Sequence, residues 1–78
     1  MVESAMVRDM RLSARNQLPG TVTSVDLGAV MATVVIRLEG GQEVVASITK
    51  GSAENLELAA GDQVTAVIKA TEVMVGKE

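Results

Sequence analysis

Apolar side chains recur at every second position in three short segments, and this alternation constrains the fold more than any other feature of the sequence. A period of two puts alternate side chains on one face of an extended chain, which is the pattern of a β-strand with one buried face. Each segment is therefore predicted to be a strand. The predicted strands and their inward faces are 31–38 with Ala32, Val34, Ile36 and Leu38, 43–49 with Val44, Ala46 and Ile48, and 63–70 with Val64, Ala66, Ile68 and Ala70.

Turn-forming residues separate the apolar segments. They lie at Pro19-Gly20, 26–28, 39–41, Lys50-Gly51 and 60–62. The Gly40-Gly41 pair is typical of a hairpin turn that needs positive φ, so the strands on either side of it are expected to be antiparallel neighbours. Residues 20–27 alternate less regularly, because Val22 has one parity whereas Val25 and Leu27 have the other. We expect a bulge or a bend in that strand.

One short helix is predicted between Thr49 and Gly61, where the period of two stops. Ser52 is a favourable N-cap, residues 53–55 would fill the first turn, and Leu56 and Leu58 would supply apolar contacts. Four or five short strands with one helical turn and many glycine corners predict an all-β fold, a small Greek-key β-barrel of the oligonucleotide/oligosaccharide-binding (OB) type. A small open sandwich is the alternative.

The composition adds a requirement for a further stabilising element. The chain has 78 residues, one small domain, and a core of that size supplies only ~3–5 kcal/mol of net stability. It contains neither Cys nor His, which excludes disulfides, thiolate zinc sites and His-based catalytic sites. Oligomerisation remains as the stabilising element. A second subunit is expected to cover the apolar residues on the outward strand faces, which are Met31, Val35, Val45 and Val67.

The charge balance disfavours several classes of partner. The formal net charge is −3 and there is no Phe, Tyr or Trp, so attraction to a nucleic-acid backbone and stacking on bases are both disfavoured. No apolar run approaches the roughly 18 residues of a membrane span, and the first residues lack the pattern of a signal peptide. A cytoplasmic protein without membrane partners is expected. Residues 2–10 carry no strand pattern and are expected to form a frayed arm or a short helix.

Hydroxyl and cationic side chains are the candidates for a binding site. Lys69 belongs to an apolar strand, where its ammonium needs an anion or open water. Ser13 and Arg15 lie two residues apart, so an extended chain puts both on one face, where they suit a single oxyanion. The alternatives are a solvated side chain for Lys69 and a surface salt bridge for Arg15.

Catalysis and cation binding have little support in the sequence. A dyad of Ser13 with Lys69 has no supporting motif spacing. The Asp and Glu residues lie mostly in predicted turns or on the predicted helix, without the clustering that a hard cation requires. Neither an enzyme nor a cation site is expected.

The stretch from Met10 to Val22, MRLSARNQLPGTV, resembles the opening of the molbindin family, the small molybdopterin-binding-protein-like (Mop or TOBE) domains. The Ser-Ala-Arg-Asn signature combined with Val-Ile-Lys-Ala-Thr at residues 67–71 is far more specific than either motif alone. The resemblance covers residues 10 to about 76. Residues 10–78 are therefore identified as one Mop/TOBE-like domain, and residues 1–9 as an N-terminal extension.

The resemblance implies a ligand, an assembly and a site. Members of this family are similar in being OB-like β-barrels that bind molybdate or tungstate, without an organic cofactor. Stand-alone members are homohexamers, trimers of dimers, with oxyanions between subunits. Ser13 and Arg15 are expected to come from one subunit and the remaining site residues from its partner. Carried over to this chain, the oxyanion site consists of Ser13, Ala14 through its backbone, Arg15, Thr49, Ser52, Lys69 and Ala70 through its amide.

The expected function is storage or homeostasis of molybdate or tungstate inside the cell. A regulatory or accessory module of molybdate transport is the first alternative, because similar domains are appended to transporter ATPases and to molybdate-responsive repressors. An OB-fold nucleic-acid binder is the second alternative, and the acidic, aromatic-free composition disfavours it. An enzyme is the weakest of the alternatives.

Overall fold

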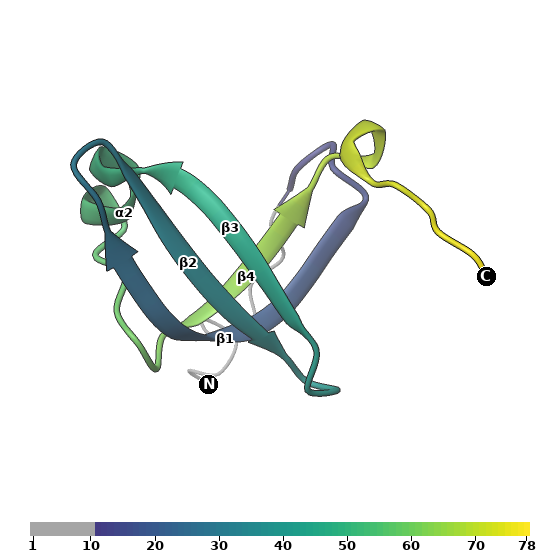
Figure 1. The fold of residues 1–78 in the computed structure, drawn as a ribbon, viewed down its shortest axis with the longest axis horizontal. Coiled ribbons are helices and arrows are strands. Elements are labelled where there is room, and N and C mark those ends of the chain that lie inside the picture. Colours follow the sequence, from purple (N-terminus) through teal and green to yellow (C-terminus); the bar gives the residue numbers. More distant parts are fainter. Residues whose placement is uncertain (1–10) are drawn as a thin grey trace.

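The computed structural model describes residues 11–78, and these form a single four-stranded antiparallel sheet with one short α-helix (Figure 1). The strand order is β3-β2-β1-β4. Helix α2 connects β3 to β4, and a single turn of 3-10 helix, η1, follows β4. The elements are β1 (Asn16–Leu27), β2 (Met31–Leu38), β3 (Glu43–Thr49), α2 (Lys50–Asn55), β4 (Gln63–Ile68) and η1 (Ala70–Glu72).

Strand β1 is long enough to serve two neighbours, and this curls the sheet into a half-barrel. Its first half pairs with β4, from Asn16 opposite Ile68, and its second half pairs with β2, as far as Leu27 opposite Ala32. The register shifts between Val22 and Ser24, so the predicted bulge is confirmed. Figure 1 shows the resulting bend, with the two ends of β1 on opposite sides of the molecule. The predicted all-β, OB-like class is therefore confirmed.

Gly20 lies at the point where β1 passes from one neighbour to the other. A Cβ at this position would be 2.6 Å from the carbonyl oxygen of Arg37 and 2.7 Å from Cγ2 of Ile36. Glycine is needed here because the two strands approach too closely for a side chain. The expectation of a turn at Pro19-Gly20 is wrong, because both residues lie inside β1 and pair with β4.

The core lies on the concave side of the curled sheet. Val22 and Val34 are 1% exposed, and Ile36 and Ala66 complete the buried cluster. In β2, Ala32, Val34 and Ile36 are buried and Leu38 is half-buried, which follows the predicted alternation. With no aromatic side chains available, this small cluster is built from branched aliphatic residues and alanine. Partly buried residues packed against it include Leu18, Val44, Ile48, Leu58 and Val64.

The β2–β3 hairpin is as predicted, whereas the start of helix α2 and the end of β4 differ from the prediction. Strands β2 and β3 are antiparallel neighbours, and Gly41 has a φ of 95°, as expected for the Gly40-Gly41 turn. The N-cap of α2 is Thr49 and not Ser52, so that prediction is wrong. Thr49 has the extended backbone that an N-cap needs, because it is also the last residue of β3, and its hydroxyl accepts a hydrogen bond from the Ser52 amide. Strand β4 ends at Ile68, two residues before the predicted end.

Two further expectations concern the N-terminal residues and membranes. The frayed arm or short helix at residues 2–10, and the extension at residues 1–9, lie outside the described residues. Within residues 11–78, no helix has both the length and the apolar character required to span a bilayer.

Candidate functional site

The predicted site residues fall into two groups, one at each end of β1. The α2 end consists of Thr49 and Ser52, where β3 runs into the helix, with Lys50 between them in sequence. The η1 end consists of the segment just before β1 and the residues just after β4. Its members are Ser13, Ala14, Arg15, Lys69 and Ala70.

Two hydroxyl groups are ordered at the α2 end. The Thr49 hydroxyl donates a hydrogen bond to Oγ of Ser52, at 2.8 Å, and accepts one from the Ser52 amide, at 3.1 Å. Because Oγ of Ser52 accepts from Thr49, the proton of the Ser52 hydroxyl is free to be donated elsewhere. Both side chains are exposed. The α2 end therefore presents a hydroxyl donor whose position is set by the helix cap.

The strand junction holds the α2 end in place. The amide of Lys50 donates to the carbonyl oxygen of Val30 at 2.8 Å, which ties the start of the helix to the turn between β1 and β2. Ala53 is 2% exposed and anchors the helix against the sheet. Lys50 is half-buried and is the cation next to the two hydroxyls in sequence. No motif in the sequence singled it out as a site residue.

Two cationic residues flank the last residue pair of β1 and β4 at the η1 end. Asn16 is opposite Ile68 in this pair, so Arg15 immediately precedes the paired part of β1 and Lys69 immediately follows that of β4. Both side chains are exposed. Lys69 follows the end of β4, so it is not within an apolar strand as the sequence indicated. Two cations at one end of the sheet favour an anion there.

Local hydrogen bonds to backbone carbonyl groups order the segments that carry these two cations. The side-chain amide of Gln17 donates to the carbonyl oxygen of Ala14 at 2.8 Å. The amide of Glu72 donates to the carbonyl oxygen of Lys69 at 2.8 Å, which closes the η1 turn. Each cation therefore lies in or beside a locally hydrogen-bonded turn.

A single subunit keeps the two ends apart. They are separated by the whole of β1, whose twelve residues would extend about 36 Å if straight, at ~3.3 Å per residue. The grouping also differs from the expected one, which put Lys69 and Ala70 with Thr49 and Ser52. In the structure, Lys69 and Ala70 lie with Arg15.

The chemistry of the two ends is that of hydrogen-bond donors. Hydroxyl, guanidinium, ammonium and backbone amide groups all donate to an oxyanion. The described residues contain no cluster of three or more His, Cys, Asp and Glu side chains that would hold a metal cation. Within residues 11–78, no polar or charged residue is buried. The polar side chains of the described part therefore lie at or near its surface.

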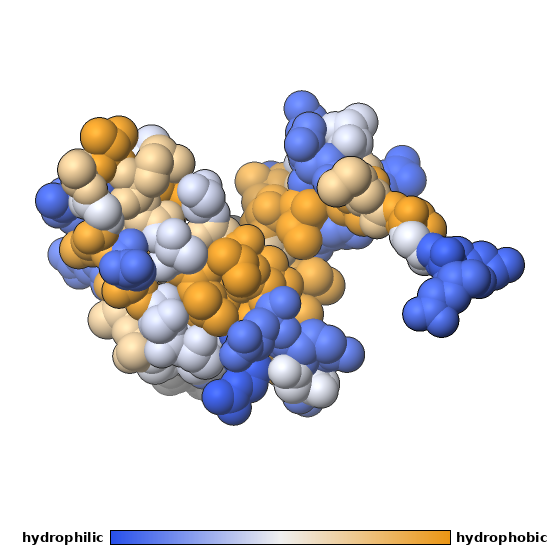
Figure 2. Space-filling model, in the orientation of Figure 1, coloured by the Kyte–Doolittle hydropathy of each residue, from blue (hydrophilic) through white to orange (hydrophobic). Residues whose placement is uncertain are grey.

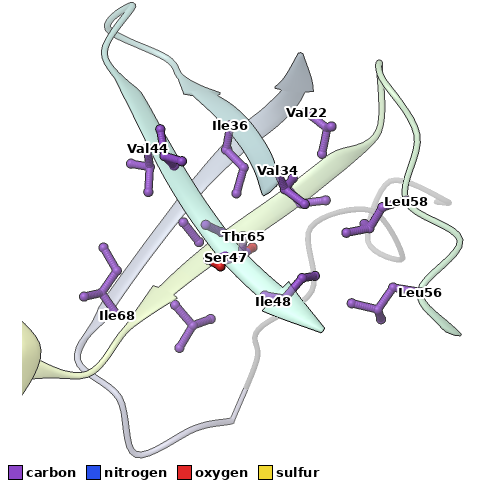
Figure 3. A pocket seen from close by; sticks show the side chains of 15 residues that line it. Val22, Val34, Ile36, Val44, Ser47, Ile48, Leu56, Leu58, Thr65 and Ile68 are labelled. Carbon is purple, nitrogen blue, oxygen red and sulfur yellow. The ribbon is translucent and has the colours of Figure 1, made fainter. Parts of the chain in front are cut away.

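A cavity in the described part is a different feature. It has a volume of about 410 Å³ and lies between β3 and β4, over the core residues Val22 and Val34 (Figure 3). Ser47 and Thr65 are the polar residues that line it. It contains none of the predicted site residues, and its apolar lining does not suit an oxyanion.

Fold and site together define a small curled β-domain whose described residues present exposed hydrogen-bond donors at both ends of β1. The model of the TOBE domain family matches residues 12–75. This match covers most of the chain, so the chain belongs to the TOBE domain family.

Two relatives show how the domain is used in other proteins. The molybdenum transport protein ModE of Azotobacter vinelandii is 51% identical over 69 residues, which are 88% of this chain and 26% of ModE. This chain therefore spans about a quarter of that relative. The molybdenum-pterin-binding protein 3 of Clostridium pasteurianum is 47% identical over 66 residues, 85% of this chain and 97% of the relative.

Solved structures agree with this relationship. A molybdate-binding protein from Sporomusa ovata superposes with a TM-score of 0.82 at 47% identity, covering 87% of this chain and all of the other. The cytoplasmic molybdate-binding protein ModG, in a form with molybdate bound, gives a TM-score of 0.75 at 44% identity, over 90% of this chain and 48% of ModG. The resemblance to molbindins is thereby confirmed.

Proposed function

We propose that this protein binds molybdate or tungstate and serves in the storage or homeostasis of the oxyanion. The observation that carries the proposal is that two cationic residues, Arg15 and Lys69, flank the last residue pair of β1 and β4 at the η1 end. The relatives named as molybdenum-pterin-binding and molybdate-binding proteins support the choice of oxyanion.

The donor chemistry suits molybdate better than phosphate. Molybdate at neutral pH is a fully deprotonated tetrahedral dianion, so each of its oxygens accepts hydrogen bonds and none donates. Phosphate keeps a proton near pH 7 and would need an acceptor, which this set of residues supplies only if a hydroxyl reorients. Two formal positive charges balance the dianion, and each charge-assisted hydrogen bond contributes roughly 1.5–3 kcal/mol.

The proposed site is shared between copies of the chain. One oxyanion would be held by the η1 end of one subunit, with Ser13, Arg15 and Lys69, and by the α2 end of another, with Thr49 and Ser52. The separation of these groups along β1 supports sharing, because one subunit does not bring them together. The assembly we propose is a homohexamer, a trimer of dimers, in the cytoplasm. ModG, described as cytoplasmic, supports the location.

Binding, and not catalysis, is the proposed activity. The named relatives are binding or transport proteins, which supports a role without a reaction. The relationship to ModE supports a second candidate, a regulatory or accessory module of molybdate transport, because this domain is about a quarter of that transport protein. We propose no nucleic-acid partner.

Calorimetric titration with molybdate, tungstate, sulfate and phosphate tests the proposal. The purified protein is titrated with each anion, and its mass is measured by light scattering on the same sample. We expect tight binding of molybdate and tungstate and weak binding of sulfate and phosphate, by an oligomer. Equal affinity for all four anions, or no binding of any, contradicts the proposal.

A further inference from the structure

Three apolar side chains are exposed around the turn between β1 and β2. Leu27, Val30 and Met31 are 50%, 71% and 44% exposed. The carbonyl oxygen of Val30 accepts a hydrogen bond from the Lys50 amide at 2.8 Å, so this turn lies against the start of α2. Figure 2 shows apolar surface beside pale, weakly polar surface at this end of the molecule, whereas strongly hydrophilic surface gathers at the tip of the β2–β3 hairpin and at the C-terminal end. The hydroxyl groups of the α2 end therefore have apolar neighbours.

The register of β2 and β3 singles out Met31 among the three. Met31 is opposite Thr49 in the pairing of these strands. The hydrogen bond from the Lys50 amide to the Val30 carbonyl joins the next residue pair, so the pair of Met31 and Thr49 is of the non-hydrogen-bonded kind. In such a pair the facing side chains are nearest, with Cβ atoms roughly 4.5–5.5 Å apart. The side chain of Met31 thus lies next to that of Thr49, on the same face of the sheet.

Both members of this pair have a fixed place in the fold. The carbonyl oxygen of Met31 accepts a hydrogen bond from the Gly28 amide at 2.8 Å, which closes the turn between β1 and β2. The hydroxyl of Thr49 bonds to the amide and to the hydroxyl of Ser52, so it is held by the helix cap. A thioether sulfur is only a weak acceptor. Met31 therefore borders an ordered pair of hydroxyls without competing for their hydrogen bonds.

An apolar side chain beside hydroxyl donors affects which anion binds. A dianion that contacts such a side chain gives up part of its hydration shell, and the free energy lost in this way is greater for a smaller ion. Sulfate is a smaller tetrahedral dianion than molybdate. The hydroxyls donate equally well to either anion, so they do not discriminate between the two. The apolar neighbour does discriminate, because it penalises sulfate more.

We propose that Met31 is a specificity-determining residue of the oxyanion site, and that its side chain forms an apolar wall beside the Thr49 and Ser52 hydroxyls that favours molybdate over sulfate. The inference rests on the proposed function, because it concerns the α2 end of the same site. It adds to the donor groups a side chain that acts by removing water from the anion. Molybdate and tungstate are nearly equal in size, so Met31 does not distinguish between them.

The ratio of the affinities for molybdate and sulfate tests the proposal. The natural protein and three variants are titrated calorimetrically with each anion at constant ionic strength. Met31→Gln has nearly the same length but a polar amide, and it should lower the ratio roughly tenfold, the low end of what one apolar contact contributes to specificity. Met31→Leu keeps an apolar side chain and should restore the ratio of the natural protein. Thr33→Gln places the same amide two residues further along the exposed face of β2 and should leave the ratio unchanged.

The titrations separate this inference from the proposed function. If the natural protein prefers molybdate and Met31→Gln prefers it equally, the inference is overturned while the proposed function stands. A ratio lowered as much by Met31→Leu or by Thr33→Gln as by Met31→Gln would also overturn it, because the polarity of the side chain beside the hydroxyls would then not be the cause. The absence of any preference for molybdate in the natural protein would contradict both proposals.

The natural protein allows an independent measurement that does not depend on how a variant folds. Its methionine methyl groups are labelled with ¹³C, and the Met31 resonance is identified by its absence from the spectrum of Met31→Leu. Titration with molybdate should shift this resonance with the midpoint found by calorimetry, because the side chain contacts the anion. A Met31 resonance that stays in place at saturating molybdate would contradict the proposal.

Discussion

The two ends of β1 carry different parts of the proposed site. At the α2 end, neutral hydroxyls are held by a helix cap, and Lys50 is tied to the neighbouring turn through its amide. At the η1 end, the backbone is held but Arg15 and Lys69 extend exposed side chains. In the proposed site, the η1 end would supply the charge that attracts a dianion, and the α2 end would supply donors in a fixed geometry.

The largest expected effect is that of ligand on stability, because binding across two subunits stabilises the folded assembly. Molybdate at 100 times its dissociation constant should add about 2.7 kcal/mol and raise the melting temperature by roughly 10–20 °C for a domain of this size. Differential scanning fluorimetry measures the shift. The variant Arg15→Ala/Lys69→Ala serves as the control and should show no shift, and a melting temperature unmoved by saturating molybdate in the natural protein would contradict the interfacial site.

Removing one charge at the η1 end should weaken binding. Arg15→Ala or Lys69→Ala is expected to cost about 2–3 kcal/mol of binding free energy, a loss of roughly 30- to 150-fold, with the oligomer retained. Arg37→Ala removes an exposed cation of β2 that belongs to neither end and should leave affinity unchanged. Calorimetric titration measures all three. An unchanged affinity for molybdate in both site variants would show that the η1 end is not part of the binding site.

Gly20 is where β1 bends between its two neighbours, so its substitution should disturb the relation between the two ends. Gly20→Ala is expected to lower the free energy of unfolding by about 2 kcal/mol, because the added Cβ meets the backbone of β2. Gly51→Ala, in helix α2 with no atom within 4 Å of the new Cβ, is the matched control and should be neutral or slightly stabilising. Urea unfolding at equal protein concentration measures both. Equal stability of the two variants would show that the close approach at Gly20 does not matter.

The α2 end should show the smallest effect. Thr49→Ala removes the helix cap and is expected to cost about 1 kcal/mol of stability, with a loss of molybdate affinity smaller than that of Arg15→Ala. Thr49→Ser keeps the hydroxyl and should retain most of both properties. Urea unfolding and titration measure the two effects. A larger loss of affinity at Thr49 than at Arg15 would reverse the assignment of tasks to the two ends.

Most of the strands could be predicted from the sequence, because the alternation of apolar residues within each strand shows which of its faces is buried. The alternation at 31–38 and 43–49 gave strands with those bounds, and the irregular parity around Val22 correctly indicated the bulge. The N-cap was misplaced because Thr49 and Ser52 are both favourable caps three residues apart, and only the end of β3 decides between them. Pro19-Gly20 looked like a turn because glycine at a close strand approach has no distinct local signature.

The site depends on pairing that the sequence does not display. The motif around Arg15 and the one around Lys69 are each visible in the sequence, but the register of β1 with β4 is what brings the two segments to the same end of the sheet. The separation of Thr49 and Ser52 from Lys69 follows from the length of β1 and the curl of the sheet. The candidate site residues could therefore be predicted from the sequence, whereas their grouping at two ends of the sheet could be seen only in the structure.

Mixing two complementary variants tests the shared site most directly. Arg15→Ala/Lys69→Ala removes the η1 end, and Thr49→Ala/Ser52→Ala removes the α2 end. Each protein is titrated with molybdate alone and then after the two are unfolded and refolded together in equal amounts. Sites that join the η1 end of one copy to the α2 end of another should recover in about one quarter of positions by random pairing, with the affinity of the natural protein. A mixture that binds no more molybdate than the separate variants would contradict a site shared between subunits.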